Sequence, residues 1–339
     1  MRIREELGIG MKILVIGKEG RLMQYAPEWA QAENYDICYV PMGASDEEIL
    51  AAGRDADFML ADAMARISED VINGMPQLKL IHSEGVGFNF FDIESAKRKK
   101  VYVCNCKAAN ADAVAEHALL LMLALLRDMV NGDSLFRHGE QINTKEAYML
   151  SGSLRELGEC SVGLLGFGDI AQSTARLLKA FGARVLYHNR TRKPELEESL
   201  GVEYVSRKEL LAESDIISVH LNSNRETYHT VDEDFLSKMK KGAYVVNTAR
   251  GELVDSAALI SAIRSGHIAG AGLDTVEGEP VGTDNVLLQA PADVADKMIF
   301  SCHIGGITGG AFRRGHQMFW KNLKTVEQGG VPRNIVNPW

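Results

Sequence analysis

The strongest constraint on the fold is an alternation of short apolar runs with polar, helical segments, which occurs twice along this chain of 339 residues. Between residues 12 and 104 the runs are KILVIG, DICYV, ADFMLA, LKLIHS and VYVC. Between residues 161 and 303 they are SVGLL, ARVLYH, DIISVHL, GAYVVNTA, IAGAGLD and KMIFSCH. Such alternation is typical of a parallel sheet with helices on both faces. We therefore expect an α/β protein with two doubly wound parallel-sheet lobes, preceded by a loose extension of residues 1 to 10.

The segments between the runs carry signals for helix ends. Ser45 followed by Glu48 forms a capping box, and Ser68 is a predicted N-cap. Further helices are predicted over residues 255 to 265, closed by Gly266, and over residues 308 to 328. Residues 111 to 129 predict a long helix that is apolar nearly all round and must therefore be buried. The sequence leaves open whether this helix packs between the lobes or against a second subunit.

Composition and charge argue against several classes of protein. The formal net charge of -9 disfavours a nucleic-acid surface, which needs clustered lysine and arginine. The longest apolar run, ALLLMLALL at residues 118 to 126, is too short to span a membrane. The first ten residues lack the apolar core of a signal peptide. We therefore expect a cytoplasmic protein that binds neither nucleic acid nor membranes.

The five cysteines predict free thiols in a reducing compartment, because their number is odd and their positions are scattered. Cys104 and Cys106 have no second pair to complete a metal site, so we expect no metal. Cys302 precedes a histidine at the end of an expected strand. Because neighbouring residues on a strand point to opposite faces, its thiol is expected to face the core.

The loop GFGDIA, residues 166 to 171, lies between an expected strand and an expected helix. Gly166 would allow a tight turn, Gly168 would let a pyrophosphate approach the backbone, and Ala171 would let the helix pack closely. The helix that begins at Asp169 and Ile170 would offer free N–H groups to the anion. The loop predicts dinucleotide binding, with a structural turn as the alternative. The first lobe carries no such loop.

The strand VLYH, residues 185 to 188, ends in a cation cluster where NAD-binding relatives carry an acidic residue for the ribose. Asn189 stands at that position and is followed by Arg190, Thr191 and Arg192. Neutral Asn189 would admit a 2′-phosphate, and the two guanidinium groups would neutralise it through charge-assisted hydrogen bonds. The cluster therefore predicts NADP as the cofactor, with NAD as the second option and a solvated basic turn as the alternative interpretation.

Six ordered motifs make the chain resemble the D-isomer-specific 2-hydroxyacid dehydrogenase family, which includes glyoxylate and hydroxypyruvate reductases. They are GVGFNFFD at 85 to 92, ADAVAEHALLLMLALLR at 111 to 127, the glycine loop, VVNTARGELVD at 245 to 255, GLDTVEGEP at 272 to 280 and CHIGG at 302 to 306. The resemblance covers residues 11 to 335 and implies NAD(P)H-dependent reduction of a small 2-oxo acid to a D-2-hydroxy acid by a homodimer. It further implies a flavodoxin-like substrate-binding domain of residues 1–108 and 306–339, a Rossmann NAD(P)-binding domain of residues 109–305, and a cleft between them.

The resemblance also assigns catalytic roles. His303 matches the family's acid/base histidine, which would protonate the carbonyl oxygen as hydride arrives, and Glu279 matches its carboxylate partner. Arg250 matches the arginine whose fork binds the substrate carboxylate and polarises the keto oxygen. The backbone N–H groups of Val86 and Gly87 would hold the substrate carboxylate. The residues alone favour a structural histidine for His303 and an ordinary turn acid for Glu279, and only the resemblance reverses this.

Cofactor contacts follow from the same motifs. Asp274 resembles the residue that orients the nicotinamide carboxamide, whereas Glu116 and His117 suit helix packing as well as ligand contact. The remaining residues expected to touch the cofactor are His220, Leu221, Thr248, Ala249, His303 and Gly305.

The chain departs from the family pattern in two places. Asn222 replaces a proline that commonly follows the SVH strand, and residues 136 to 150 lack a tryptophan that many relatives carry. Met64, Arg66, Phe88 and Phe90 are candidates to line the pocket for the substrate side chain.

Two other functions are open on the same fold. One is a dinucleotide-sensing binding protein of the C-terminal-binding corepressor type, which acts through protein partners. The other is oxidation of formate or phosphite. The acidic charge and the lack of an appended tail favour an enzyme over the corepressor type.

Overall fold

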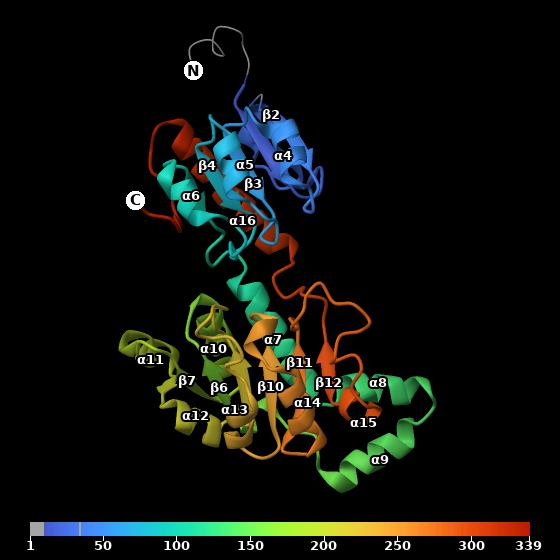
Figure 1. Ribbon diagram of the computed structural model, residues 1–339. Helices are drawn as coiled ribbons and strands as arrows, with labels where there is room; N and C mark the ends of the chain where they lie inside the picture. The colour runs from blue at the N-terminus through green and yellow to red at the C-terminus, as the bar shows by residue number, and fades with distance from the viewer. Residues whose placement is uncertain (1–9, 34) are drawn as a thin grey trace. The chain divides into compact units, whose positions relative to one another are not determined.

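A computed structural model describes residues 10–33 and 35–339, and these residues form two compact units (Figure 1). The first unit contains the chain up to Asn110 together with Ile307–Trp339, and the second contains Ala111–Gly306. Both are built on entirely parallel sheets, so the predicted fold class is confirmed. Residues 1–9, most of the extension predicted from the sequence, lie outside the described residues.

The first unit holds a five-stranded sheet in the order β2-β1-β3-β4-β5, the flavodoxin-like order. Its strands are β1 (Lys12–Ile16), β2 (Asp36–Val40), β3 (Phe58–Ala61), β4 (Leu80–Ser83) and β5 (Tyr102–Cys104). Ile13 and Val15 of β1 belong to the core on one face of the sheet, and Leu14 and Ile16 belong to the core on the other. This pattern arises because successive side chains of a strand alternate between faces, and both faces are covered.

Helices from both ends of the chain cover this sheet. One face packs against α2 (Arg21–Gln24), α3 (Glu28–Ala32) and α16 (Gly309–Glu327). The other packs against α4 (Asp46–Gly53), α5 (Glu69–Gly74) and α6 (Ile93–Arg98). The return of α16 to the first unit makes that unit discontinuous in sequence.

The predicted caps are confirmed. The Ser45 hydroxyl accepts a hydrogen bond from the Glu48 N–H while the Glu48 carboxylate accepts one from the Ser45 N–H. The Ser68 hydroxyl accepts from the Val71 N–H at the start of α5. Because these bonds join near neighbours in sequence, a local pattern was sufficient to predict them.

The second unit holds a seven-stranded sheet in the order β12-β11-β10-β9-β6-β7-β8. Its strands are β6 (Ser161–Leu165), β7 (Arg184–His188), β8 (Glu203–Tyr204), β9 (Ile216–Val219), β10 (Ala243–Asn247), β11 (Ile268–Leu273) and β12 (Met298–Phe300). The order reverses between β6 and β9, which places the expected ligand crevice beyond the carboxyl ends of these two strands. β8 was not predicted, because it has two residues and no recognisable pattern.

Helices cover both faces of this sheet too. One face packs against α7 (Ala111–Leu126) and α10 (Asp169–Ala180), with α11 (Pro194–Leu200) beside them. The other packs against α12 (Arg207–Glu213), α13 (Glu233–Lys238), α14 (Ser256–Arg264) and α15 (Ala292–Ala295). Two short 3₁₀ turns, Leu157–Glu159 and Gly251–Leu253, complete the unit.

The long apolar helix, α7, is shorter than predicted. It ends at Leu126 rather than at residue 129, because Asp128 adopts a left-handed conformation with φ of 47°. Leu120 is 57% exposed in the single chain, so the second unit does not itself cover this side of the helix, and burial against a second subunit stays a prediction. Its other face packs on α10 and the sheet within the second unit.

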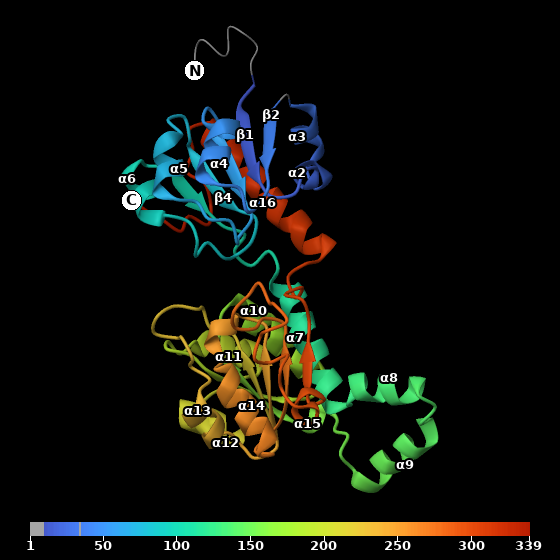
Figure 2. The same cartoon turned by 45° about the vertical axis from the view of Figure 1, so that its right-hand side comes forward.

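The next two helices, α8 (Met129–Arg137) and α9 (Gln141–Ser151), form a hairpin that extends from the rest of the second unit (Figure 2). No residue of either helix is buried. Large apolar side chains on or beside them are exposed: Leu120, Met129, Val130, Phe136, Ile142, Met149 and Leu150. A hollow of about 410 Å³ lies between the helices, lined by Phe136, Tyr148 and Met149 among others.

All five cysteines are free thiols. Cys302 is exposed, so the prediction that it faces the core is wrong. The reason is that β12 ends at Phe300, and the alternation of a strand does not extend to residue 302. Within the described residues, no cluster of three or more histidine, cysteine or acidic side chains could hold a metal ion. No helix of this part of the chain is long and apolar enough to cross a membrane.

Candidate active site

The glycine loop of the second unit connects β6 to α10. Gly166 has φ of 95°, a conformation that favours glycine, and a Cβ there would lie 2.5 Å from the carbonyl oxygen of His220. Gly168 is the N-cap of α10 and has open space where a side chain would stand. No side chain caps the helix, so the first-turn N–H groups at Asp169 and Ile170 are available to an anion.

The cation cluster after β7 separates into one free and one paired arginine. Arg192 forms a two-pronged ion pair with Glu197, with N···O distances of 2.9 and 2.7 Å, and its guanidinium lies 5.4 Å from the centre of the Tyr204 ring. This guanidinium, aided by Tyr187, lowers the pKa of Glu197 to about 2. Arg190 is exposed and forms no ion pair with any described residue. Arg192 is therefore already occupied, and Arg190 is the cation that remains open.

Two further bonds shape this segment. The Asn189 side chain donates to the Thr191 carbonyl at 2.8 Å, which closes the turn on itself. The Lys193 ammonium donates to the Phe167 carbonyl of the glycine loop at 2.9 Å. The end of β7 is thus tied to the loop that would hold a pyrophosphate.

His303 and Glu279 lie together as the sequence analysis expected. Nδ1 of His303 is 2.6 Å from a Glu279 carboxylate oxygen, whose partner oxygen accepts from the Val276 N–H at 2.9 Å. Because a carboxylate only accepts, Nδ1 carries the hydrogen, and Nε2 has no partner among the described residues. Burial alone would raise the pKa of Glu279, but the His303 and Val276 hydrogen bonds and the nearby Arg250 charge lower it.

The backbone at His303 is left-handed, with φ of 55°, which is unfavourable for a residue with a side chain. Asp274 holds this turn: its carboxylate accepts from the N–H groups of Ile304 and Gly305 at 2.9 and 2.8 Å, and its carbonyl accepts from the His303 N–H. The Ser301 hydroxyl also donates to Asp274 at 2.6 Å. These bonds fix the histidine in its strained conformation.

His117 belongs to the same network. Its Nε2 lies 2.7 Å from the Ser301 oxygen and 3.3 Å from Asp274. Burial would raise the pKa of Asp274, yet the bonds from His117, Ser301 and the two backbone N–H groups hold that pKa well below its usual range. His117 is therefore bonded to the loop that carries His303, and contact with a ligand stays a prediction for this residue. Glu116 forms no hydrogen bond or ion pair with any described residue.

Arg250 is half-buried at the end of β10, where its guanidinium donates to the Ala249 carbonyl at 2.7 Å. The following Gly251 lies against the segment that carries Glu279, because a Cβ there would be 2.0 Å from the Val276 carbonyl carbon. This contact brings the TARG and EGEP motifs together, although they lie far apart in sequence. Asn247 reinforces the turn by donating to the Arg250 carbonyl and accepting from the Ala249 N–H.

A second histidine–glutamate pair uses the other acid of EGEP, Glu277, which lies two residues before Glu279. Nε2 of His229 is 2.7 Å from Glu277, and Nδ1 is 3.7 Å from Asp255. The Tyr228 ring stacks on His229 at 3.9 Å and its hydroxyl donates to Glu277. Sequence patterns could not separate Glu277 from Glu279, and His229 was not recognised at all because its partner is 48 residues away.

Three more residues expected to touch the cofactor, His220, Leu221 and Thr248, follow β9 and β10. The Thr248 hydroxyl is buried without a hydrogen-bond partner among the described residues. Burial lowers the pKa of His220 to about 4, so its imidazole is neutral, and its Nε2 lies 2.9 Å from the Ser218 hydroxyl. Leu221 is half-buried against the core. A buried hydroxyl without a partner costs free energy unless a ligand supplies one.

In the first unit, Val86 and Gly87 lie in the loop after β4. The carbonyl of Val86 accepts from the Asn105 amide at 2.7 Å, and that of Gly87 accepts from the Ser83 hydroxyl at 2.6 Å. No described residue accepts a hydrogen bond from the N–H of Val86 or Gly87. The loop therefore presents two free N–H donors.

The candidates for the substrate side-chain pocket are not gathered into one pocket of this unit. Met64 and Phe90 are exposed, and Phe88 packs against the core. Arg66 lies beside a shallow hollow that Phe90 also lines, at 3.9 Å from Asp46.

Comparison with known proteins agrees with this geometry. The family profile described as the NAD binding domain of D-isomer specific 2-hydroxyacid dehydrogenases matches residues 119–305. A glyoxylate reductase of Thermococcus litoralis is 36% identical over 293 residues, covering 85% of this chain and 86% of that protein. The chain therefore belongs to the D-isomer-specific 2-hydroxyacid dehydrogenase family.

Solved structures support the same family. A glyoxylate reductase from Paecilomyes thermophila has a TM-score of 0.81 at 28% identity and covers 96% of this chain and 98% of its own. The D-lactate dehydrogenase of Aquifex aeolicus, solved with NAD and lactic acid, has a TM-score of 0.77 at 27% identity, with 96% and 99% covered.

Proposed function

We propose that this protein reduces a small 2-oxo acid, such as glyoxylate or hydroxypyruvate, to the D-2-hydroxy acid with NAD(P)H. In this proposal the first unit binds the substrate and the second binds the cofactor. The observation that carries it is the His303–Glu279 pair, which holds one ring nitrogen and leaves the other free. The glyoxylate reductases among the relatives support this substrate class.

The His303–Glu279 pair determines which ring nitrogen can donate a proton to the substrate. With Nδ1 held by Glu279, a protonated His303 carries its second hydrogen on Nε2, where it can be donated to the carbonyl oxygen of the substrate. The Glu279 carboxylate stabilises the imidazolium before transfer and fixes the tautomer that remains afterwards. In the oxidative direction, neutral Nε2 would accept the proton from the hydroxyl.

The substrate would be oriented by the Arg250 guanidinium and by the free N–H groups of Val86 and Gly87. The Arg250 fork can bind the carboxylate and polarise the keto oxygen, because a guanidinium offers paired donors in a plane. The open N–H groups of Val86 and Gly87 suit the carboxylate in the same way as other backbone anion sites. Each of these groups favours an anionic 2-oxo acid over a neutral carbonyl compound.

The second unit fits a nicotinamide dinucleotide. Gly168 leaves room for a pyrophosphate beside the uncapped start of α10, and the buried Thr248 hydroxyl needs a partner. When bound, the reduced nicotinamide supplies the hydride to the carbonyl carbon. The residues that would hold the cofactor are Gly166, Gly168, Asp169, Ile170, Asn189, Arg190, Thr191, His220, Leu221, Thr248, Ala249, Asp274 and Gly305. Arg192 would act mainly by bracing this segment.

We further propose NADP as the preferred cofactor. Asn189 introduces no negative charge against a 2′-phosphate, and the exposed guanidinium of Arg190 has no competing carboxylate in the described part of the chain. This support is narrower than the sequence suggested, because Glu197 already neutralises Arg192.

The direct test is oxidation of NADPH and NADH, followed at 340 nm, with a panel of 2-oxo acids. Wild-type protein should reduce at least one of them, and His303→Ala should lose about 10²- to 10⁴-fold in kcat, the usual contribution of a general acid. Cofactor binding by fluorescence titration should be unchanged in the variant. Tight cofactor binding with no reduction of any 2-oxo acid would instead favour the corepressor-type function. Reduction of NADP⁺ or NAD⁺ by formate or phosphite would favour the third function.

The exposed apolar hairpin of α8 and α9 supports a homodimer as the working form. Apolar side chains such as Phe136 and Leu150, which are 61% and 89% exposed, gain from burial against a second copy. Light scattering should give twice the chain mass for the wild type and the monomer mass for Leu150→Glu combined with Phe136→Glu. The cytoplasmic address remains a prediction from the sequence.

A further inference from the structure

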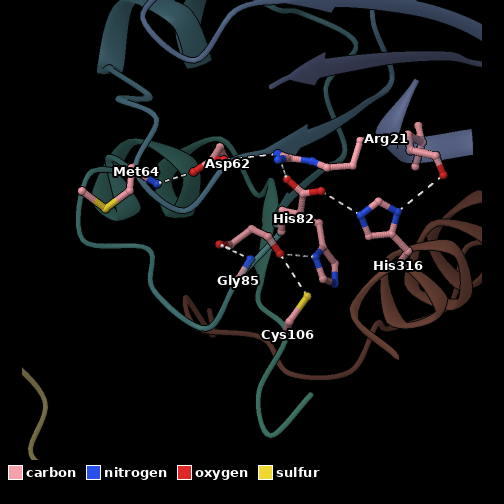
Figure 3. Close-up of polar contacts among 10 residues, drawn as sticks. Arg21, Asp62, Met64, His82, Gly85, Cys106 and His316 are labelled. Carbon is pink, nitrogen blue, oxygen red and sulfur yellow. Dashed lines mark hydrogen bonds and ion pairs between the residues drawn. The ribbon is translucent and has the colours of Figure 1, made fainter. Parts of the chain in front are cut away.

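A cluster of charged side chains in the first unit takes no part in the proposed reaction. Arg21, Asp62 and Glu84 follow β1, β3 and β4, and the Arg21 guanidinium pairs with both carboxylates. Figure 3 shows Arg21 beside Asp62. His316 reaches the same place from α16. We name these four residues the loop clamp.

The loop clamp is closed on itself. One Glu84 oxygen pairs with the Arg21 guanidinium and the other lies 2.8 Å from Nε2 of His316. Nδ1 of His316 lies 3.4 Å from the Leu22 carbonyl, so both ring nitrogens face acceptors. The side chains of Glu84 and His316 are 7% and 1% exposed. Both Glu84 oxygens therefore have donors, which offset the cost of burying this side chain.

Arg21 connects the loop after β3, which carries Asp62, to the loop after β4, which begins at Glu84. The same nitrogen that pairs with Glu84 lies 3.2 Å from Asp62, whose other oxygen accepts from the Met64 N–H at 3.0 Å. Gly17 makes room for this guanidinium, because a Cβ there would lie 3.0 Å from it. Arg21 therefore sets the distance between the loop that carries Met64 and the loop that begins at Glu84.

The loop that begins at Glu84 carries the two free N–H groups, those of Val86 and Gly87. Its first carbonyl, of Gly85, accepts from the Cys106 N–H at 2.9 Å. The carbonyls of Val86 and Gly87 are bound by Asn105 and Ser83, as described above. All three carbonyls are thus occupied, whereas the N–H groups of Val86 and Gly87 stay open. Glu84 precedes this loop directly, so its two ion-pair partners anchor the loop at its base.

We propose that Arg21, Glu84 and His316 are positioning residues that hold the Gly85–Gly87 loop, and through Asp62 the Met64 loop, in the geometry that binds a 2-oxo acid carboxylate. This inference rests on the proposed function. All four residues of the loop clamp belong to the first unit, to which the proposed function assigns substrate binding. Loss of the clamp should therefore weaken substrate binding without slowing the chemical step.

The test compares Arg21→Lys, Glu84→Gln and His316→Gln with Arg98→Gln. Arg98 is a matched control because it is an arginine of the same unit in an exposed ion pair with Glu69. Glu84→Gln and His316→Gln should raise KM for the 2-oxo acid about tenfold, while kcat at saturating substrate and KM for NADPH stay within about twofold of wild type in every clamp variant. Arg21→Lys keeps a cation between the two carboxylates but lacks the fork. It should therefore fold and show a smaller rise in KM than Glu84→Gln.

A fall in kcat without a rise in KM, or an equal change in Arg98→Gln, would overturn the proposal. Hydrogen exchange of peptides covering residues 84 to 90 gives a readout that needs no activity. Exchange there should speed up in Arg21→Lys and not in Arg98→Gln, and unchanged exchange in Arg21→Lys would count against the clamp. If the wild type reduces no 2-oxo acid, the proposed function fails, and the exchange data still decide whether the clamp holds the loop.

Discussion

Each unit carries a buried or half-buried histidine–glutamate pair beyond the ends of its strands, and the two pairs differ in what surrounds them. In the first unit, His316 and Glu84 have every hydrogen-bonding atom occupied, and their side chains are 1% and 7% exposed. In the second, His303 and Glu279 are 38% and 21% exposed, and Nε2 of the histidine is open.

The same two side chains therefore suit different tasks. A closed pair can hold neighbouring backbone in place but cannot exchange a proton with a ligand. An open pair keeps one nitrogen fixed and offers the other. The atom without a hydrogen-bond partner, rather than the residue type, therefore indicates which pair can transfer a proton. The same distinction applies to the two arginines after β7, of which Arg192 is closed by Glu197 and Arg190 is open.

The largest effect on kcat is expected when Glu279, rather than Glu277, of the EGEP motif is substituted. Glu279→Gln should lower kcat about 10²-fold, because a neutral amide no longer stabilises the imidazolium of His303. Glu277→Gln should lower kcat by less than about threefold, because Glu277 pairs with His229 and leaves the open pair intact. Steady-state kinetics on both variants measure this difference. Equal losses would show that the assignment of the open pair is wrong.

Arg190→Ala should raise KM for NADPH about tenfold and leave KM for NADH unchanged, because it removes a charge-assisted hydrogen bond to the 2′-phosphate. Arg192→Ala should have a smaller effect on the same ratio, since its guanidinium is engaged with Glu197. The kcat/KM values for the two cofactors measure the preference. Equal kcat/KM for NADPH and NADH in the wild type would contradict the proposed cofactor.

Closed polar groups should make the protein sensitive to acid. Burial, with a smaller contribution from the nearby His316 charge, lowers the pKa of His82 to about 4. The unfolded chain takes up this proton near pH 6.5, so the unfolded state binds more protons between pH 6.5 and 4, and stability falls as the pH falls through this range.

The expected slope is about 1.4 kcal/mol per pH unit for each such histidine, and His220 adds a second. Urea unfolding from pH 4.5 to 6.5 measures the slope. His82→Gln should reduce it, whereas His138→Gln, at an exposed position, is the control. An unchanged slope in His82→Gln would mean that His82 is protonated in the folded protein.

The smallest effect concerns the open hydroxyl of Thr248. Thr248→Val removes a buried polar group that has no partner in the described residues, so the free energy of unfolding should rise by about 1 kcal/mol. Cofactor affinity should fall by about threefold, the loss of one neutral hydrogen bond. Thermal unfolding measures the change in stability, and fluorescence titration measures the change in cofactor affinity. A loss of stability would indicate that the hydroxyl is already satisfied in the free protein.

The fold was predictable because its signals are local and repeated. Each strand appears as an apolar run, and the caps at Ser45 and Ser68 bond to residues three positions away. Where the signal was short or extrapolated, the prediction failed. The two residues of β8 have no pattern, and Cys302 was placed by a strand that ends two residues earlier.

The candidate site was predictable only in part. The motifs predicted that His303, Glu279, Arg250 and Asp274 belong to the site. In the structure, His303 bonds to Glu279 and to the Asp274 carbonyl. Motifs could not predict that Ser301 and His117 contact Asp274. They also could not predict the hydrogen bond between His229 and Glu277 or the ion pair between Arg192 and Glu197.

The sequence by itself determined two parallel-sheet lobes, a glycine loop between a strand and a helix, and the residue types available for catalysis. These follow from periodicity, turn chemistry and short spacings, all of which act between near neighbours. Tertiary structure alone decided which atoms are occupied, because ion pairs such as Arg21 with Glu84 and His316 with Glu84 join residues 63 and 232 positions apart. Function depends on the atoms that such contacts leave free, as at Nε2 of His303.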